Sequence, residues 1–368
     1  ILWDISKRWP ASDWDRMSKF HLLPGDVVVA MDRPWIPAGL KWSYIRASDP
    51  KALLVQRCAR LRSSNERLDQ NFLRFVIGGP GFESYVVPIT TGVNVPHISG
   101  QQILDFEFTL PPLPVQQRIA GILSAYDELI ENSQRRIRIL EKMARSLYRE
   151  WFVQFRFPGH DKVKMEGGIP KGWEKKPFTD IADVLSGGTP KTDVAVYWNG
   201  QIPFFTPRDT PDCFYVQDTD KHITELGLSK CASALYPPDT VFITARGTVG
   251  KVALPSVPMA MNQSCYALRG KPGIPQQFLF LMTLQQVDYL KTNTGGATFD
   301  TIVVDTFRRM KVVIPSRETI ARFTLHTNAV FEQIDTCQRQ IHNLIRTRDL
   351  LLPRLLSGQV NLGEPSGE

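Results

Sequence analysis

The longest regular pattern of hydrophobic and polar positions begins at Ile119. From there apolar residues recur at alternating steps of four and three, which is the pattern of a helix that packs along a seam against another helix. Only Ser133 interrupts the row. Pro114 suits the first turn of such a helix, and Phe-Pro-Gly at 157–159 ends it. The seam consists of Ile119, Leu123, Tyr126, Ile130, Ile137, Leu140, Ala144, Leu147 and Trp151.

The opposite face of this helix carries charged side chains, which predicts a solvated face. They are Glu128, Glu131, Arg135, Arg136, Arg138, Glu141, Lys142 and Arg145.

A second seam lies near the end of the sequence. Thr327 and Arg348 interrupt it, and Pro353 is expected to bend or end the helix. We expect the two seams to pair antiparallel within the chain, and a bundle with another subunit is the alternative. The second seam consists of Phe323, Val330, Ile334, Cys337, Ile341, Leu344, Leu351 and Leu355.

The two helices belong to an internal repeat. Residues 128–147 align with 332–351, and shorter matches precede both helices in the same order. A duplicated unit of roughly two hundred residues, with a mixed domain followed by a long helix, explains this order. One of the matches places Arg33 opposite Arg246. The upstream matches pair 23–33 with 236–246, 55–62 with 262–269, 70–75 with 276–281, and 108–113 with 312–316.

The elements of the second mixed domain are short. We expect a short strand with a polar exit within 202–209, and a strand, a glycine-containing turn and a second strand within 239–254. A helix is expected at 276–292 and a closing strand within 309–315. The segment 177–190 predicts a helical turn that ends at Ser-Gly-Gly. These elements indicate an α+β fold.

If the two helices are antiparallel, an approximate two-fold axis would relate the two domains. The repeat divides the chain into four segments. The segments are a first mixed domain at 1–112, a long helix at 113–157, a linker and second mixed domain at 158–315, and a long helix with a tail at 316–368. Few residues precede the match at 23–33, so the first domain is expected to lack its N-terminal part.

Composition narrows the function. The formal net charge is +7 and the pI is about 9.1, which favours a polyanionic partner such as nucleic acid. The five scattered cysteines form no CxxC pair, which argues against a zinc ribbon and for a reducing cytoplasm. No apolar run is long enough for a membrane span. The six histidines have no metal-ligand spacing, and neither GGTPKT nor GTVGK has the spacing of a phosphate-binding loop.

The sequence resembles the specificity subunit of type I restriction–modification systems. The resemblance rests on the segment 110–155 and on GWEKKPFTDIADVLSGGTPKT, which opens the second domain. IPFFTPRD, ARGTVGKVAL, MNQSCYAL and the terminal LLLPRLLSGQV are also similar. The resemblance implies two target-recognition domains separated by two helices, each domain reading half of a split site in double-stranded DNA. It implies two modification subunits that hold S-adenosylmethionine and restriction subunits that use ATP and Mg²⁺, with no cofactor or metal in this chain.

Candidate DNA contacts are polar residues at strand exits and turns, because Arg and Lys bind phosphates and guanine edges, and amides bind adenine. A surface or turn-forming role is the alternative for each, and Trp35 is as well suited to the core. The candidates are Arg33, Trp35, Lys41 and Gln56 in the first domain and Arg208, Arg246, Thr248, Lys251, Asn262 and Gln263 in the second.

A non-catalytic DNA-recognition subunit is the leading hypothesis. A DNA-modifying or cleaving enzyme with an unrecognised site is an alternative, as is a coiled-coil scaffold without a DNA role. A catalytic chain would need a cofactor motif or a carboxylate–lysine metal site, and the sequence shows neither in a convincing context.

We predict that the length of the paired helices sets the spacing between the half-sites. A heptad inserted near Ser133 alone should break the pairing of the seams. A matched heptad near Cys337 should restore it and lengthen the spacer by about 10 Å, roughly three base pairs. The preferred spacer can be measured by binding to duplexes of graded spacer length. An unchanged spacer in the matched variant would contradict the prediction.

Overall fold

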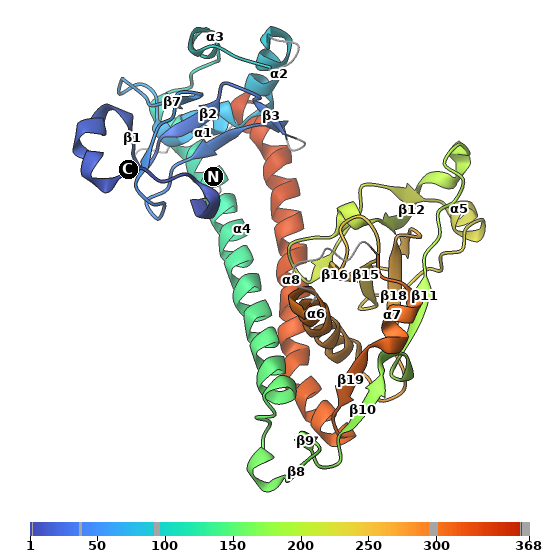
Figure 1. Cartoon of the computed structure of the whole chain (residues 1–368). Coiled ribbons are helices and arrows are strands. Elements are labelled where there is room, and N and C mark those ends of the chain that lie inside the picture. The colour runs from blue at the N-terminus through green and yellow to red at the C-terminus, as the bar shows by residue number, and fades with distance from the viewer. Residues whose placement is uncertain (2, 37–38, 92–95, 294–300, 361, 363–368) are drawn as a thin grey trace. The chain divides into compact units, whose positions relative to one another are not determined.

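The computed structural model describes residues 1, 3–36, 39–91, 96–293, 301–360 and 362. The chain forms two compact units (Figure 1). Unit 1 comprises Ile1–Ile130 and Asn343–Glu368, and unit 2 comprises Glu131–His342. The last residues of the predicted C-terminal tail, 363–368, lie outside the described residues.

Unit 1 is built around a three-stranded antiparallel sheet. Its central strand β2 (Val27–Ala30) lies between β5 (Trp42–Tyr44) and β7 (Cys58–Leu61). Helices α1 (Gln70–Ile77) and α2 (Pro80–Ile89) follow β7. The smaller elements are the 3₁₀ helices η1 (Trp3–Ile5), η2 (Ala11–Asp13) and η3 (Asp15–Phe20), the pair β1 (His21–Leu22) and β6 (Ala52–Leu53), the pair β3 (Trp35–Ile36) and β4 (Gly39–Leu40), and α3 (Gly100–Leu104).

The central strand of unit 1 is buried on both faces, which explains its unbroken run of valines. Val27 and Val29 pack with Leu73 and Phe82 of the two helices. Val28 points to the other face, where it packs with residues of the β1 region.

Unit 2 contains a five-stranded sheet in the order β11-β18-β15-β16-β13. Its strands are β11 (Ala182–Ser186), β13 (Tyr215–Val216), β15 (Val241–Thr244), β16 (Val252–Pro255) and β18 (Cys265–Gly270). A smaller sheet combines β14 (His222–Ile223), β12 (Trp198–Phe205) and β17 (Ala260–Met261). Two antiparallel pairs complete the unit: β10 (Glu174–Pro177) with β19 (Lys311–Ile314), and β8 (Met165–Glu166) with β9 (Ile169–Pro170).

The helices of unit 2 bury an aromatic core. Helix α6 (Gln276–Asn293) lies between the sheet and the long helix α8 (Arg317–Leu356), as Figure 1 shows. Phe278 and Phe280 of α6 face Phe323 and Phe331 of α8, with ring centroids 6.2 and 6.0 Å apart. The remaining helices are α5 (Glu225–Ser229), α7 (Val304–Arg309), and η5 (His160–Lys162), η6 (Phe178–Asp180), η7 (Ala195–Tyr197) and η8 (Pro207–Asp209).

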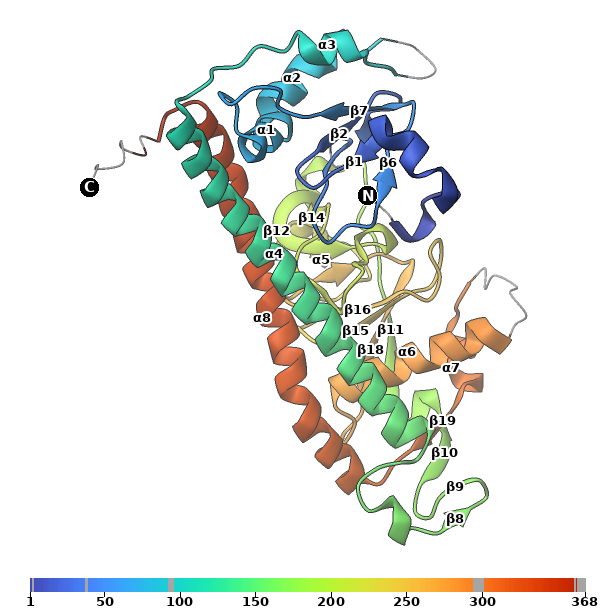
Figure 2. The same cartoon turned by 90° about the vertical axis from the view of Figure 1, so that its left-hand side faces the viewer.

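The seam prediction is confirmed. Helix α4 (Leu113–Tyr148) continues into a π-helical turn, η4 (Arg149–Val153). It begins in unit 1 and ends in unit 2, whereas α8 begins in unit 2 and ends in unit 1, so the two helices run antiparallel. Within each unit they lie side by side (Figure 1 and Figure 2). The apolar clusters that join them include Ile119, Leu123, Leu351 and Leu355 in unit 1, and Ile137, Ala144, Ile334 and Cys337 in unit 2.

At three places the structure departs from what the local sequence suggests. Ser133 and Thr327 do not open the seam, because both are buried and the Thr327 hydroxyl donates to the Phe323 carbonyl at 3.1 Å. Of the two expectations for Pro353, an end of the helix is wrong, because α8 continues to Leu356, whereas a bend stays a prediction. The segment after Asp180 is the edge strand β11, because its backbone pairs with β18, a partner that the local sequence does not reveal.

Glu141 also departs from the sequence prediction, which placed it on the solvated face. Its side chain is buried, and its Oε1 accepts a hydrogen bond from the Phe214 backbone N–H at 2.6 Å. Burial raises the pKa of the Glu141 carboxyl, while this hydrogen bond and the nearby Arg145 charge act in the opposite direction. Glu141 therefore ties α4 to the chain that enters β13.

The internal repeat is reproduced in the hydrogen bonds of a glutamine at the start of a helix. In unit 1 the Gln70 amide donates to the carbonyls of Gly25 and Leu61, at 2.6 and 3.2 Å. Its Oε1 accepts from the Ser63 N–H at 2.7 Å. The side chain thus joins the turn before the central strand, the end of the neighbouring strand and the following helix.

Gln276 repeats this arrangement in unit 2. Its amide donates to the carbonyls of Asp239 and Leu268, at 3.1 and 3.2 Å. Its Oε1 accepts from the Gly270 N–H at 2.6 Å. Since the three bonds join equivalent elements in the same order, the two mixed domains share one scaffold.

We predict that Glu141→Ala destabilises unit 2 by about 1–3 kcal/mol, because it leaves the buried Phe214 N–H without an acceptor. Glu141→Gln keeps a side-chain oxygen at this position and serves as the matched control. Urea unfolding followed by tryptophan fluorescence measures both variants. Equal losses of unfolding free energy in the Ala and Gln variants would show that the side-chain oxygen of residue 141 is not what stabilises this contact.

Candidate nucleic-acid interface

In unit 1, three segments meet where the central strand ends. The Ala30 N–H donates to the Lys41 carbonyl at 3.0 Å, and the Met31 N–H donates to the Arg57 carbonyl at 2.9 Å. These bonds bring the loop after β2, the start of β5 and the turn before β7 to one edge of the sheet. We call this the unit 1 edge.

The structure brings three of the four unit 1 candidates to this edge. Arg33 and Gln56 are exposed, and Lys41 is half-buried. Arg33 has a left-handed backbone (φ 46°), and its N–H donates to the Pro96 carbonyl at 2.7 Å. Among the described residues, no carboxylate lies within 4.0 Å of the Arg33 or Lys41 side-chain nitrogens. Trp35 is different, because it is half-buried and packs against the core of unit 1.

A cluster of ionisable side chains that the sequence prediction missed lies at the same edge. The Asp32 carboxylate is bonded to His97 Nδ1 at 2.6 Å and paired with Arg57 Nε at 3.2 Å. Burial and the Asp32 charge raise the pKa of the nearby Cys58 thiol. Asp32 and His97 are 65 residues apart, so no local motif could have indicated the pair.

At the equivalent edge of the unit 2 sheet, four segments lie together. The Thr244 N–H donates to the Lys251 carbonyl at 2.9 Å, and the Ala245 N–H donates to the Ser264 carbonyl at 2.7 Å. The Asn262 N–H donates to the Phe205 carbonyl at 3.0 Å. The exits of β15 and β12, the start of β16 and the turn before β18 therefore lie together. We call this the unit 2 edge.

All six unit 2 candidates belong to these segments. Arg208, Arg246, Thr248, Lys251 and Gln263 are exposed, and Asn262 is half-buried. Within the described part of the chain, no carboxylate lies within 4.0 Å of the side-chain nitrogens of Arg208, Arg246 or Lys251. Unpaired cations beside amide and hydroxyl groups can bind phosphates and the edges of bases.

The Gly-Gly-Thr-Pro segment also reaches the unit 2 edge, which sequence reasoning missed. A Cβ on Gly187 would lie 2.1 Å from the Asn262 carbonyl oxygen, so only glycine permits this approach. The Thr189 hydroxyl donates to Gln263 Oε1. Gly187 therefore allows its loop to pack closely against the turn that carries Asn262 and Gln263.

The backbone hydrogen bonds at the two edges shift the sequence alignment, which paired Arg33 with Arg246, by one residue. Met31 and Ala245 make equivalent bonds, so Asp32 matches Arg246 and Arg33 matches Gly247. Arg33 and Gly247 both have a left-handed backbone, at φ 46° and 77°. The identity of Arg33 and Arg246 suggested the wrong match. Lys41 and Lys251 are the basic residues that occupy equivalent positions.

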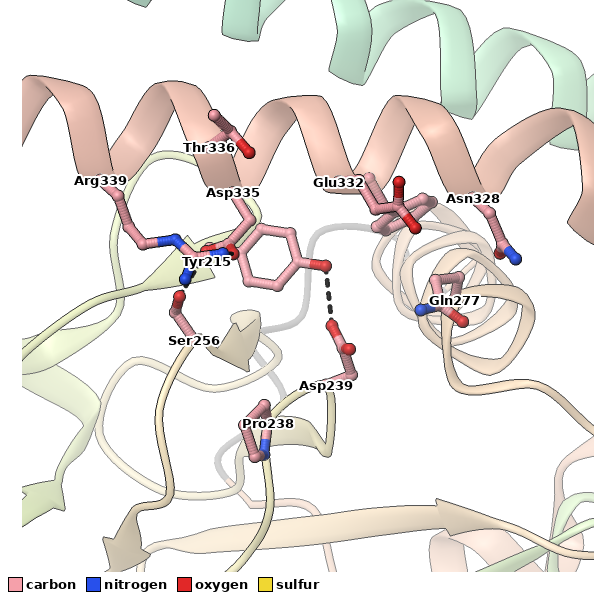
Figure 3. A pocket seen from close by; sticks show the side chains of 11 residues that line it. Tyr215, Pro238, Asp239, Ser256, Gln277, Asn328, Glu332, Asp335, Thr336 and Arg339 are labelled. Atoms are coloured by element: carbon pink, nitrogen blue, oxygen red, sulfur yellow. Dashed lines mark hydrogen bonds and ion pairs between the residues drawn. The ribbon is translucent and has the colours of Figure 1, made fainter.

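Unit 2 also has a polar cavity of about 390 Å³ beside α8 (Figure 3). The Tyr215 hydroxyl donates to Asp239 Oδ1 at 2.7 Å, and Asp335 accepts from Ser256 and pairs with Arg339. Three carboxylates and one guanidinium line the cavity, so its charge does not suit a polyanion. Among the described residues, no group of three or more His, Cys, Asp or Glu side chains could hold a metal ion.

Comparison with known proteins identifies a family. The family model described as "Type I restriction modification DNA specificity domain" matches residues 17–142 and 170–341. The MjaIX specificity subunit of Methanocaldococcus jannaschii, a type I restriction enzyme subunit, is 32% identical over 172 residues, which are 46% of this chain and 40% of the relative. The HindI specificity subunit of Haemophilus influenzae is 24% identical over 330 residues, with 72% and 71% covered. The chain thus spans less than half the length of the first relative.

A solved structure has the same fold. The S subunit of a type I restriction–modification system from M. genitalium matches with a TM-score of 0.60 at 16% identity. The match covers 92% of this chain and 84% of that one. In the described part of the chain, every helix is too short or too polar to cross a membrane.

Asp239 predicts a pH dependence of stability. Burial and the Asp335 charge raise the pKa of the Asp239 carboxyl, although the Tyr215 hydrogen bond opposes the shift. Because the folded state then binds the proton more tightly, the stabilisation is present below the unfolded pKa of about 4 and is lost as pH rises through the folded pKa.

Asp239→Asn should remove the loss of stability at high pH, because an amide does not ionise. Asn can also accept the Tyr215 hydrogen bond and tolerates the left-handed backbone (φ 63°). We predict that the variant unfolds at a higher temperature than the wild type at pH 7–8 and that the difference disappears towards pH 4. Thermal unfolding across this range is the measurement. Parallel pH profiles for the two proteins would contradict the prediction.

Proposed function

The chain belongs to the family of type I restriction–modification DNA specificity domains, and we propose that each of its units reads one half of a bipartite site in double-stranded DNA. The observation that carries the proposal is the equivalent edge of the two units, where cations that have no acidic partner among the described residues stand beside amide and hydroxyl groups. The formal net charge of +7 supports it, because phosphate contacts supply most of the non-specific affinity for DNA.

Different side chains at the edges suit different parts of this task. A lysine at the start of the neighbouring strand, Lys41 or Lys251, provides a point charge for a phosphate. The exposed guanidiniums of Arg208 and Arg246 can form paired hydrogen bonds with O6 and N7 of a guanine. Asn262 and Gln263 can bind an adenine in a similar way. Phosphate contacts would fix the position of each unit, and the side chains on base edges would select the sequence.

We further propose that the chain is a non-catalytic subunit that works in the cytoplasm. Its partners would be two modification subunits, which hold S-adenosylmethionine, and restriction subunits, which use ATP and Mg²⁺. The family supports this assignment, because its members are the DNA-recognition components of type I systems. The chain would recognise the target sequence for both the modification and the restriction subunits.

Arg246→Ala tests the proposal. If Arg246 reads a base, we predict a loss of about 1–3 kcal/mol that falls on one half-site only. If it contacts a phosphate, binding should fall evenly over all sequences, with a shallower salt dependence. Arg269→Ala is the matched control, because Arg269 is also exposed in unit 2 but lies at the opposite end of β18 and pairs with Asp183 at 3.2 Å.

The measurement is competition binding with duplexes that vary each half-site separately, at two salt concentrations, together with a melting curve. A loss of thermal stability along with binding would mean that Arg246 only shapes the turn at Gly247. Full binding with unchanged half-site preference would remove Arg246 from the interface. Failure of the wild-type chain, with its modification subunits, to select any sequence from random duplex would reject the proposed function.

A further inference from the structure

The exit loop of the central strand is flanked on both sides by equivalent segments in the two units. On one side lie the bonds from Met31 to Arg57 and from Ala245 to Ser264. On the other, the Ile98 N–H donates to the Met31 carbonyl and the Ile302 N–H donates to the Ala245 carbonyl, both at 2.9 Å. Position 97 of unit 1 therefore matches position 301 of unit 2.

Three matched positions at the edges carry different chemistry on this shared backbone. Unit 2 has the permanent cation Arg246, flanked by the hydroxyl residues Ser264 and Thr301. Unit 1 has Asp32, Arg57 and His97 at the corresponding positions, and these form the cluster described above, in which Asp32 is hydrogen-bonded to His97 and ion-paired with Arg57. The scaffold is constant while the side chains differ, as expected of positions that set the preference of each half-site.

We propose that His97, held in place by Asp32, is a base-contacting residue of unit 1, and that it takes over at the unit 1 edge the role proposed for Arg246 at the unit 2 edge, although the position matched to Arg246 is Asp32 itself. The inference rests on the proposed function, because it assigns a contact within the DNA site of unit 1. Asp32 is a positioning residue in this account, since its Oδ1 is hydrogen-bonded to His97 and its Oδ2 is ion-paired with Arg57.

The imidazole is fixed from two directions. The backbone of His97 exchanges hydrogen bonds with Thr91, at 2.7 and 3.0 Å, and its Nδ1 is bonded to Asp32 Oδ1. The side chain nevertheless remains 46% exposed. Among the described residues, Nε2 has no hydrogen-bond partner, so it is the ring atom available to a ligand. A fixed group with one free polar atom loses little entropy on binding and discriminates by position.

The free nitrogen suits the edge of a base. Depending on its protonation, Nε2 donates to the O6 or N7 acceptors of guanine or accepts from the exocyclic amino groups of adenine or cytosine. Arg57, whose side chain is 76% exposed, lies on the other side of Asp32 and offsets the carboxylate charge that would otherwise repel DNA. The cluster thus presents a hydrogen-bonding group without an exposed uncompensated anion.

The experiment uses the full chain assembled with its modification subunits. The bipartite site is first selected from a random duplex pool with the wild-type complex. Competition binding then compares duplexes with single base-pair changes at every position of both half-sites. The variants are His97→Ala, Asp32→Asn and Asp32→Ala, and a melting curve accompanies each.

For His97→Ala we expect discrimination at one or two base pairs of one half-site to fall by roughly 10-fold or more. Discrimination at the other half-site should remain unchanged. Asp32→Asn keeps an acceptor for the imidazole and should retain more discrimination than Asp32→Ala. His21→Gln is the control, because His21 also belongs to unit 1 but is stacked on Trp14 with centroids 3.6 Å apart. It should leave every base preference intact.

Unchanged discrimination in His97→Ala would overturn the inference, and so would an even loss over all sequences together with a lower melting temperature, because that pattern indicates a structural tie. If Arg246→Ala still changes the base preference at the other half-site, the proposed function survives and only the role of His97 fails. If the wild-type complex selects no bipartite site, the proposed function and this inference both fall.

Discussion

The antiparallel ladder between the central strand and its neighbour is the constraint on which each unit depends. In unit 1 it pairs β2 with β7, and in unit 2 it pairs β15 with β18. Gln70 and Gln276 close one end of the ladder by joining the preceding turn, the neighbouring strand and the next helix. Because this end is closed by the same three bonds in both units, the register of the ladder fixes which side chains appear at the opposite end, where the candidate interface lies.

The two long helices, the helix α6 and the strands β15, β16 and β19 could be predicted because their information is local. A heptad row identifies a paired helix without knowledge of its partner, and a short run of buried aliphatic residues identifies a central strand. The exceptions depend on distant residues. Glu141 is buried because the Phe214 N–H, 73 residues later, needs an acceptor, and β11 is a strand because β18 offers it an edge.

The candidate site could be predicted only in outline, for the same reason. Exposed arginines after strands were a usable signal, and they do lie at the edges. Residue identity then paired Arg33 with Arg246, whereas the hydrogen bonds pair Arg33 with Gly247, since both residues take the left-handed turn. The Asp32–His97 contact had no sequence signal at all, because tertiary folding alone brings the two side chains together. A conserved backbone with exchangeable side chains would allow each unit to change its half-site independently.

Hydrogen–deuterium exchange of the assembled complex, with and without its selected duplex, tests the central claim most directly. The account predicts that bound DNA slows amide exchange at both edges, in 31–33 and 55–58 of unit 1 and in 245–251 and 262–265 of unit 2. The opposite ends of the ladders, around Gly25 and Asp239, should exchange at unchanged rates. Protection at only one edge, or protection at the glutamine ends instead, would contradict the claim that two equivalent edges bind DNA.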